Sequence, residues 1–235
     1  MNTFLDDESL VHLPLATDAD RDEVVERLFD MWSATASEAV APDEGDSGGP
    51  MGHVESLAYI VPFLESLLDD PPDELPLAAC AQIVHMVEYP AVPEIVVIQT
   101  AFGRRAGEEM VRHLERLFAR ARQRNLSVDE YIADAADTGR IAHDRTARMF
   151  RGEVRRAPDD ERMRTAIRIL RRAASLVPPE LRSHLLCAIG WLQWARGRRP
   201  VALAYLAEAE RTDSGCPFPL AITELVSARR PRWCA

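Results

Sequence analysis

The chain has 235 residues, of which 47% are hydrophobic, and a formal net charge of −10, a composition that fits a soluble protein with an ordinary apolar core. It contains no run of about 18 apolar residues, and residues 1–10 lack the basic and apolar blocks of a signal peptide, so we expect a cytoplasmic protein with no membrane partner. All 28 basic residues are arginines, and only Arg21 and Arg27 fall within the first hundred positions, which also hold 21 acidic residues. The chain is thus an electrostatic dipole, explained most simply by two halves that face each other or by solvated surfaces.

The first predicted element is an acidic helix over residues 18–40. Its apolar positions, among them Val24 and Leu28, follow one stripe, and acids occupy its first turns, where they suit the helix dipole. Residues 41–52 (APDEGDSGGPMG) are acidic, rich in glycine and poor in apolar side chains, the composition of a segment that cannot offset its own ordering entropy. We therefore expect an N-terminal helical segment over 1–40 and a flexible linker over 41–52.

A second helical region is predicted over residues 53–158, with prolines at the boundaries between its helices. We expect these helices over residues 54–68, 75–89, 94–102, 105–124 and 127–136. The last begins with a capping box formed by Ser127 and Glu130. Residues 92–100 (VPEIVVIQT) are rich in β-branched side chains and could form a strand, but no partner strand is visible, so we favour a buried helix.

The stretch from residue 183 to 216 has the spacing of a single tetratricopeptide repeat, a 34-residue helix-turn-helix unit. Small residues such as Gly190 would let two antiparallel helices approach closely, and Gly197 would allow the tight turn between them. Pro200 suits the first turn of the second helix, where an amide has no helical partner. The positions that carry the pattern are Gly190, Gly197, Pro200, Ala202, Leu206 and Ala209.

Weaker copies of this pattern flank the unit. Ala166, Leu170 and Ala173 precede Ala202, Leu206 and Ala209 by 36 residues, which indicates a preceding second helix. Residues 218–229 form an amphipathic segment suited to cap a stack of helical repeats. We therefore predict an all-α fold, an irregular helical bundle over 53–158 that continues into a short tetratricopeptide-like array with a C-terminal cap over 159–235.

The first helix of the unit supplies the candidate interaction surface. In repeat geometry its concave, ligand-facing positions are His184, Cys187, Trp191, Trp194 and Ala195. Aromatic anchors in such a place suit peptide recognition. The alternative is that at least one tryptophan is core, covered by neighbouring helices in so short an array.

Nothing in the sequence predicts catalytic residues, a cofactor or a metal site. The four cysteines form no CxxC pair and are expected to be reduced thiols, with a link between Cys216 and Cys234 as a remote alternative. Single helical pairs such as His85 with Glu88 and Glu109 with His113 are expected to interact on helix surfaces, because a metal site needs a second contributing pair. Known nucleophile and phosphate-loop motifs are missing.

Residues 164–174 (RTAIRILRRAA), 178–197 (PPELRSHLLCAIGWLQWARG) and 201–213, with Pro231 to Trp233, resemble the C-terminal region of an actinobacterial family catalogued as domain of unknown function 4192 (DUF4192). The likeness extends more weakly upstream through residues 94–107. Members of that family begin with an α/β region, whereas residues 1–70 here predict helices and a linker. The family has no established activity, so the resemblance implies a helical C-terminal region and transfers no functional residue.

These observations favour a non-catalytic protein-interaction module that binds a protein partner or a second copy of itself. The alternative is a nucleic-acid-associated regulator. Residues 104–172 carry 18 arginines against 12 acids, enough to suggest contacts with phosphate, with the acidic N-terminal half as partner or autoinhibitor. The interspersed acids and the lack of aromatic interleaving make a salt-bridged helix surface the simpler reading of that region.

Overall fold

The computed structural model describes residues 12–40, 51–69, 74–89, 91–126, 145–213 and 217–234, with residues 130, 131, 134 and 138 between them. Over the described residues the protein is 79% helical and contains no strand, so the predicted all-α class is confirmed. The α-helices are α1 (Asp18–Val40), α2 (Met51–Asp69), α3 (Leu77–Val87), α4 (Val92–Phe102), α5 (Arg104–Gln123), α7 (Arg145–Phe150), α8 (Asp160–Ser175), α9 (Ser183–Ala195), α10 (Arg199–Thr212) and α11 (Pro217–Ala228). Short 3₁₀ turns lie at η3 (Pro179–Leu181) and η4 (Arg232–Cys234).

Two helices form the centre of the molecule. Every residue of α4 except Glu94 is buried, and every residue of α9 except His184 is buried. A helix that is apolar all round needs neighbours on every side. For α9 these are α4, α8, α10 and α11. The β-branched run over residues 92–100 is therefore a buried helix, as favoured from its helical surroundings.

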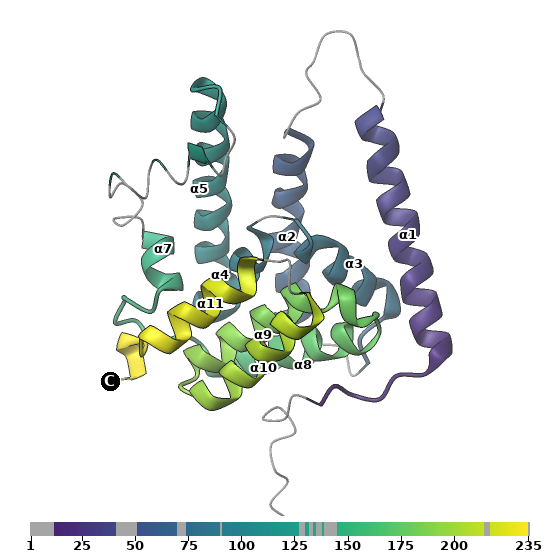
Figure 1. The fold of residues 1–235 in the computed structure, drawn as a ribbon. Coiled ribbons are helices and arrows are strands. Elements are labelled where there is room, and N and C mark those ends of the chain that lie inside the picture. The colour runs from purple at the N-terminus through teal and green to yellow at the C-terminus, as the bar shows by residue number, and fades with distance from the viewer. Residues whose placement is uncertain are drawn as a thin grey trace, which may run out of the picture.

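The remaining helices pack around this centre (Figure 1). The C-terminal helices α8, α9, α10 and α11 lie together in the lower part of the view, and α2 and α5 rise from them. The acidic helix α1 stands at one edge, where it packs against α3, and α5 stands at the opposite edge, where it packs against α4 and α2. The two ends of the charge dipole thus occupy opposite edges of the molecule.

The pair α9 and α10 has the close packing that the glycine spacing predicts. A Cβ atom at Gly190 would lie 2.9 Å from Cγ of Leu206 and 3.3 Å from the carbonyl oxygen of Ala202, so only glycine allows the observed approach. Gly197 has φ +78° in the turn between the helices, and Pro200 lies in the first turn of α10. That this helix pair belongs to a repeat array stays a prediction.

One sequence-based boundary is corrected by the structure, and others lie outside the residues that it describes. Helix α2 begins at Met51, inside the linker expected over 41–52, while residues 41–50 and Ser127 of the expected capping box lie outside the described residues.

Cys80, Cys187 and Cys234 are free thiols, and Cys216 lies outside the described residues. Burial raises the pKa of the Cys80 thiol to about 11, so this group is an inert part of the core at neutral pH.

In the part of the chain that the structure describes, no single helix is long and apolar enough to cross a bilayer. Helices α3 and α4 reach that length and composition only when taken together, and they meet at an angle of 117°.

Candidate functional site

The candidate surface predicted on α9 is core. Trp191 and Trp194 are each 1% exposed. Cys187 and Ala195 are buried as well, and His184 alone of the five predicted residues reaches the surface. Four of the five side chains are therefore buried and do not line an open groove, and the alternative that at least one tryptophan is core holds for both.

The tryptophans are covered by segments of their own chain. Trp191 stacks on Phe150 with ring centroids 5.7 Å apart, and its Nε1 donates a hydrogen bond to the Phe150 carbonyl oxygen at 2.9 Å. Trp194 Nε1 donates to the carbonyl oxygen of Arg229 at 3.1 Å. From the C-terminal end, Trp233 packs on Trp194 and donates from Nε1 to the Ala195 carbonyl oxygen at 2.8 Å. Each of the three indoles thus satisfies its one donor, and the rings of Trp191 and Trp194 are buried.

His184 belongs to a small acid–imidazole cluster where α3, α4 and α9 meet. Its Nδ1 lies 3.3 Å from Oε1 of Glu88, which follows the last residue of α3. The hydrogen bond to Glu88 raises the pKa of His184, with help from the charges of Glu94 and Asp213 and against its partial burial. The ring also lies 5.8 Å from that of Phe218 on α11.

Desolvation shifts the pKa values of two further groups near this junction. Burial raises the pKa of Glu94, whose Oε2 has no hydrogen-bond partner among the described residues. Burial lowers the pKa of His85, and the Tyr89 hydroxyl lies 3.2 Å from its Nε2. The expected pairing of His85 with Glu88 is therefore wrong, because His85 meets Tyr89 while Glu88 meets His184 on another helix.

The cluster joins the ends of three helices. Its ion pair connects residues 96 positions apart, so spacing along one helix could not reveal it. Among the described residues no group of three His, Cys, Asp or Glu side chains is arranged to hold a metal ion. We assign this cluster a structural role.

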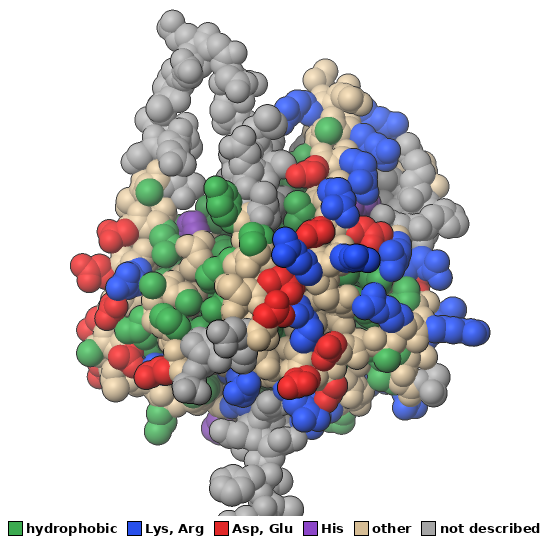
Figure 2. All heavy atoms as spheres, turned by 180° about the vertical axis from the view of Figure 1, so that it is seen from behind, with side chains coloured by type: hydrophobic (Ala, Val, Ile, Leu, Met, Phe, Trp, Pro, Cys, Tyr) green, Lys and Arg blue, Asp and Glu red, His purple; other side chains and the backbone are tan. Residues whose placement is uncertain are grey.

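A different surface has the character of a binding site. An apolar groove of about 710 Å³ lies between α2 and α3, a volume in the range of small-molecule pockets. Its wall from α2 presents Tyr59, whose side chain is 75% exposed, beside Pro62 and Phe63. The groove, which we call the α2/α3 groove, is lined by Tyr59, Pro62, Phe63, Pro76, Ala78, Ala79, Gln82 and Met86. Seen from behind, hydrophobic side chains gather between α1 at the left and α2 at the centre (Figure 2).

A buried polar network fixes the wall that α2 provides. Arg162 on α8 pairs with Glu65 at 2.7 Å and with Asp69 at 3.0 Å. Gln99 on α4 donates from Nε2 to the same Glu65 carboxylate at 2.7 Å and to the Val61 carbonyl oxygen at 2.8 Å. Helix α2, which carries Tyr59 at the groove, is thereby held to both α4 and α8.

Sequence reasoning missed this groove for a physical reason. Apolar residues occur on several sides of the 54–68 helix, a pattern typical of a helix buried all round. The structure buries Ile60, Leu64 and Leu67 and leaves Tyr59 outside. Only the Pro62 interruption hinted that one side of this helix differs from the others.

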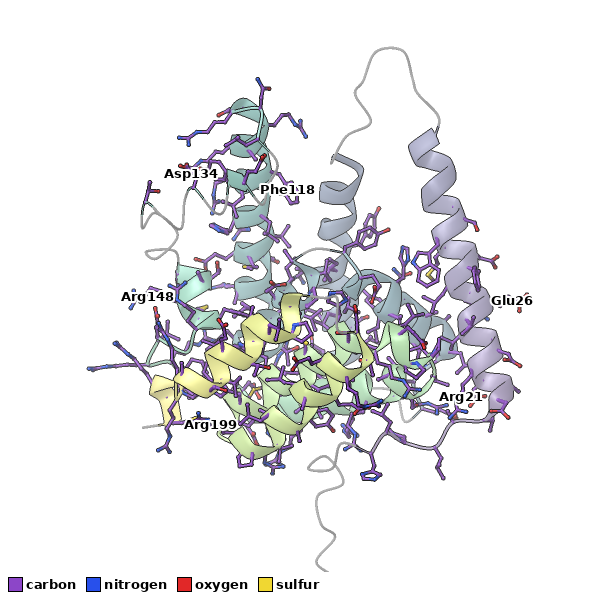
Figure 3. The ribbon with its side chains drawn as sticks, in the orientation of Figure 1. Arg21, Glu26, Phe118, Asp134, Arg148 and Arg199 are labelled. Carbon is purple, nitrogen blue, oxygen red and sulfur yellow. The ribbon has the colours of Figure 1, made fainter. Side chains whose placement is uncertain are left out.

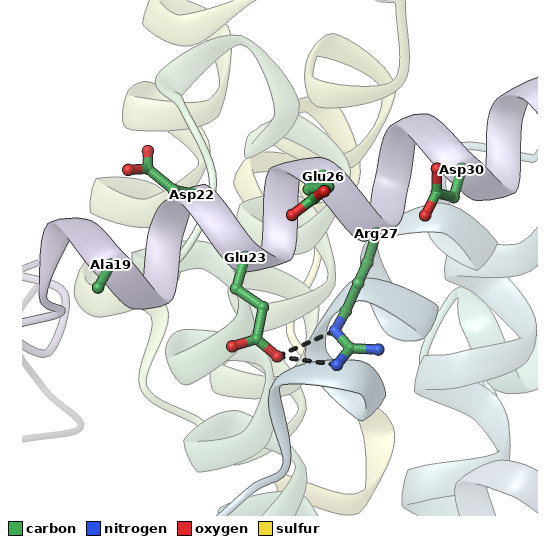
Figure 4. A pocket seen from close by; sticks show the side chains of 6 residues that line it. All are labelled: Ala19, Asp22, Glu23, Glu26, Arg27 and Asp30. Carbon is green, nitrogen blue, oxygen red and sulfur yellow. Dashed lines mark hydrogen bonds and ion pairs between the residues drawn. The ribbon is translucent and has the colours of Figure 1, made fainter.

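The helix that packs on the far side of α3 carries an acidic face. Asp22, Glu23, Glu26 and Asp30 project from neighbouring turns of α1 (Figure 4). The arginine among them, Arg27, pairs with Glu23 at 2.8 Å. Glu26 points away from the body of the protein, whereas Arg21 at the base of α1 reaches toward the C-terminal helices (Figure 3), where its Nε donates to the Ser175 carbonyl oxygen.

The opposite edge of the molecule is basic. On α5 the apolar face, which includes Met110 and Leu114, is buried, and arginines occupy the exposed face. Successive residues of an α-helix are rotated by 100° about its axis, and on this basis four of the arginines fall within about a third of a turn of one another. These are Arg105, Arg112, Arg116 and Arg120, here called the α5 arginine stripe. Figure 2 shows the basic side chains over this edge and acidic ones along α1.

Comparisons of the chain with family models, curated proteins and solved structures gave no match. The resemblance to DUF4192 accordingly stays a prediction, and the function is argued from the surfaces described above.

Proposed function

We propose that the chain is a cytoplasmic, non-catalytic protein-interaction module whose docking site is the α2/α3 groove. The supporting observation is an aromatic side chain held out of the core: Tyr59 is 75% exposed, whereas Ile60, Val61 and Leu64 on the same helix are buried. Trp191 and Trp194 are buried with their indole donors satisfied, so the chain does bury large aromatic side chains elsewhere.

The groove has the composition of an interaction hot spot. Tyrosine supplies a large rigid contact area at low entropic cost, and it is enriched among residues that dominate binding energy. The neighbouring Phe63 and Met86 add apolar and polarizable surface that adapts to a partner. Large exposed apolar patches that are bounded by polar residues mark sites where proteins associate.

Site-specific photo-crosslinking tests this proposal. A photoreactive phenylalanine analogue at position 59 is expected to give discrete adducts in cells of the source organism, identified by mass spectrometry. The matched control carries the same analogue at Leu220, which is 50% exposed on α11. The purified partner should then bind the wild-type chain and lose most of its affinity for Tyr59→Asp. Adducts at position 220 alone, or a partner indifferent to Tyr59→Asp, would contradict the proposal.

The α5 arginine stripe supports a second candidate function, binding of nucleic acid. Its four guanidinium groups have no ion-pair partner among the described residues, whereas Arg104 and Arg145 nearby pair with Glu108 and Glu109. Four such charges suffice for weak, salt-dependent contact with a phosphate backbone.

A titration with an oligonucleotide tests whether the α5 arginine stripe binds nucleic acid or is only a solvated surface. The wild-type chain should bind single-stranded DNA at low salt, with a log–log salt slope that falls by about 0.7 for each stripe arginine changed to glutamine. Replacing the exposed Arg148, Arg155, Arg168 and Arg230 by glutamine changes the net charge equally and should leave the slope intact. Equal loss in both quadruple variants, or no binding at low salt, excludes the stripe as a nucleic-acid site.

A further inference from the structure

We propose that the α5 arginine stripe docks the outer face of α1 of a second copy of this chain. The contact does not involve the α2/α3 groove, so it goes beyond the docking function proposed above and is tested independently of it.

Three acids lie in a row on the outer face of α1 (Figure 4). Asp22, Glu26 and Asp30 are exposed and follow one another at intervals of four residues, about 6 Å along the helix axis. The row is centred about half a turn away from Val24 and Leu28, which are fully buried. We call these three residues the α1 acid row, and it points away from the body of its own chain.

The charge of the α1 acid row is not neutralised within the chain. The two arginines of α1 pair with acids outside the row, Arg21 with Asp18 at 3.1 Å and Arg27 with Glu23 at 2.8 Å. The row itself has no ion-pair partner among the described residues, so three negative charges face the solvent.

The α5 arginine stripe repeats the same spacing with the opposite charge. Its last three members, Arg112, Arg116 and Arg120, are exposed and again four residues apart. The acids of α5 leave these arginines free, because Glu108 and Glu109 pair with arginines outside the stripe.

The geometry of α-helices lets the two rows run alongside each other. Residues spaced by four form ridges that are inclined to the helix axis, and such ridges on two helices align when the axes cross at about −50°. With equal rises between their charges, three arginines of one copy then meet three carboxylates of the other, and each pair is a charge-assisted hydrogen bond.

The fold prevents the two rows from meeting within one chain. Helix α1 stands at one edge of the molecule and α5 at the opposite edge, with acidic and basic side chains over the respective edges (Figures 1 and 2). A copy whose stripe is occupied therefore still presents its own α1 acid row on the far side. Such a contact is heterologous, and copies add head to tail.

A nucleic acid would use the same arginines and would compete with this contact. We favour the second copy as the occupant because the α1 acid row matches the stripe in charge, number and spacing. Every chain that carries the stripe also supplies the row.

Two variants of the full chain test the contact by complementation. The acid variant and the stripe variant each lose one of the two rows; they carry Asp22→Asn, Glu26→Gln and Asp30→Asn, and Arg112→Gln, Arg116→Gln and Arg120→Gln, respectively. In sedimentation velocity at about 20 mM salt, each variant alone should be monomeric. Their equimolar mixture should form a 1:1 dimer and nothing larger, because only one acid row and one stripe remain.

The wild-type chain should form larger species as its concentration rises. Exposed ion pairs are individually weak, so the association is expected at high micromolar concentration. It should weaken at least about tenfold between about 20 mM and 0.2 M salt, because salt screens exposed charges.

Charge-matched variants and Tyr59→Asp are the controls, and circular dichroism confirms that each variant folds. Neutralising three exposed acids or three exposed arginines elsewhere should leave the assembly of the wild-type chain unchanged; these sets are Glu180→Gln, Glu210→Gln and Glu224→Gln, and Arg148→Gln, Arg155→Gln and Arg168→Gln. Tyr59→Asp should assemble like the wild type, so failure of this proposal and failure of the docking function at the groove are distinguishable.

Three results would overturn the proposal. The first is a wild-type chain that stays monomeric at low salt, and if the stripe variant then loses binding to single-stranded DNA, the stripe serves nucleic acid instead. The second is a mixture of the acid and stripe variants that forms no dimer while the wild type assembles. The third is an equal loss of assembly in the charge-matched controls, or a loss in Tyr59→Asp, which would place the contact elsewhere.

Discussion

The guanidinium of Arg162 on α8 meets the carboxylate of Glu65 on α2 at 2.7 Å, and the two residues are 97 positions apart in the sequence. Gln99 donates to the same carboxylate from α4. One acidic group therefore receives donors from two helices and holds the wall of the groove in register with the centre of the fold. A mostly buried carboxylate of this kind depends on its donors, because desolvation without them is costly.

Removing the Arg162 guanidinium should destabilise the whole chain. Arg162→Met keeps the aliphatic stem but leaves Glu65 with an unpaired charge, and we expect a loss of about 2–3 kcal/mol in the free energy of unfolding measured by urea titration. The control Arg164→Met removes an arginine whose side chain is 57% exposed and pairs with Asp160, and should cost less than about 0.5 kcal/mol. Similar losses in the two variants would show that the network is not a stabilising centre.

The burial of Trp194 predicts a stability phenotype for changes at this residue. Trp194→Ala should lower the free energy of unfolding by about 3–5 kcal/mol, because it empties a site enclosed by Gly152, Trp191 and Trp233. Trp32→Ala on α1 removes the same side chain from a partly exposed site and should cost about 1–2 kcal/mol. Chemical denaturation followed by circular dichroism measures both, and a stable, folded Trp194→Ala protein would contradict the packing described.

Close approach of α9 and α10 makes Gly190 sensitive to a single methyl group. Gly190→Ala should cost about 1–2 kcal/mol, because overpacking against Leu206 outweighs the better helix propensity of alanine. Leu206→Ala alone opens a cavity, and the added methyl group should fill part of it in the double variant. A double-mutant cycle is thus expected to show a favourable coupling of at least about 0.5 kcal/mol, and simple additivity would argue against the contact.

The pair of His184 with Glu88 predicts a pH-dependent part of the stability. The folded pKa of His184 is raised above its ordinary value of 6.5, so the pair stabilises the protein fully below pH 6.5 and less as the pH rises through the folded pKa. Glu88→Gln should therefore cost more at pH 6 than at pH 9, by less than about 1 kcal/mol because both side chains are partly exposed.

Urea titrations of Glu88→Gln at the two pH values test this sign, with Glu210→Gln on the exposed face of α10 as the control. A cost that is equal at pH 6 and pH 9, or larger at pH 9, would contradict the assignment of the pair. Glu94 and Asp213 also act on His184 and are kept unchanged in both variants.

Local features of the fold could be predicted from the sequence because they depend on neighbours along the chain. The turn at Gly197 and the start of α10 at Pro200 follow from backbone geometry alone. The small residue at Gly190 predicted close helix packing, although not which side chain would fill the space. Helical surroundings were enough to favour a helix over a strand for residues 92–100.

The candidate site could not be predicted in the same way because burial is decided by distant segments. Trp191 and Trp194 have the spacing of a ligand-facing pair, but Phe150 and Arg229, 41 and 35 residues away, cover them and accept their indole protons. Tyr59 lies in a helix that is apolar on several sides, and only the position of α3 leaves it exposed. Periodicity gives the faces of a helix, and the tertiary contacts determine which of them is solvated.

The packing of Trp233 on Trp194 and its hydrogen bond to the Ala195 carbonyl oxygen have a consequence for synthesis of the protein. A nascent chain that has reached α9 but not residues 229–234 lacks the segment that covers the ring of Trp194 and leaves the carbonyl group of Ala195 unpaired. Such an intermediate exposes hydrophobic surface, so it is prone to aggregate and is a substrate for chaperones. Translation that stalls within the last turn of α11 should therefore produce aggregation or degradation of the chain.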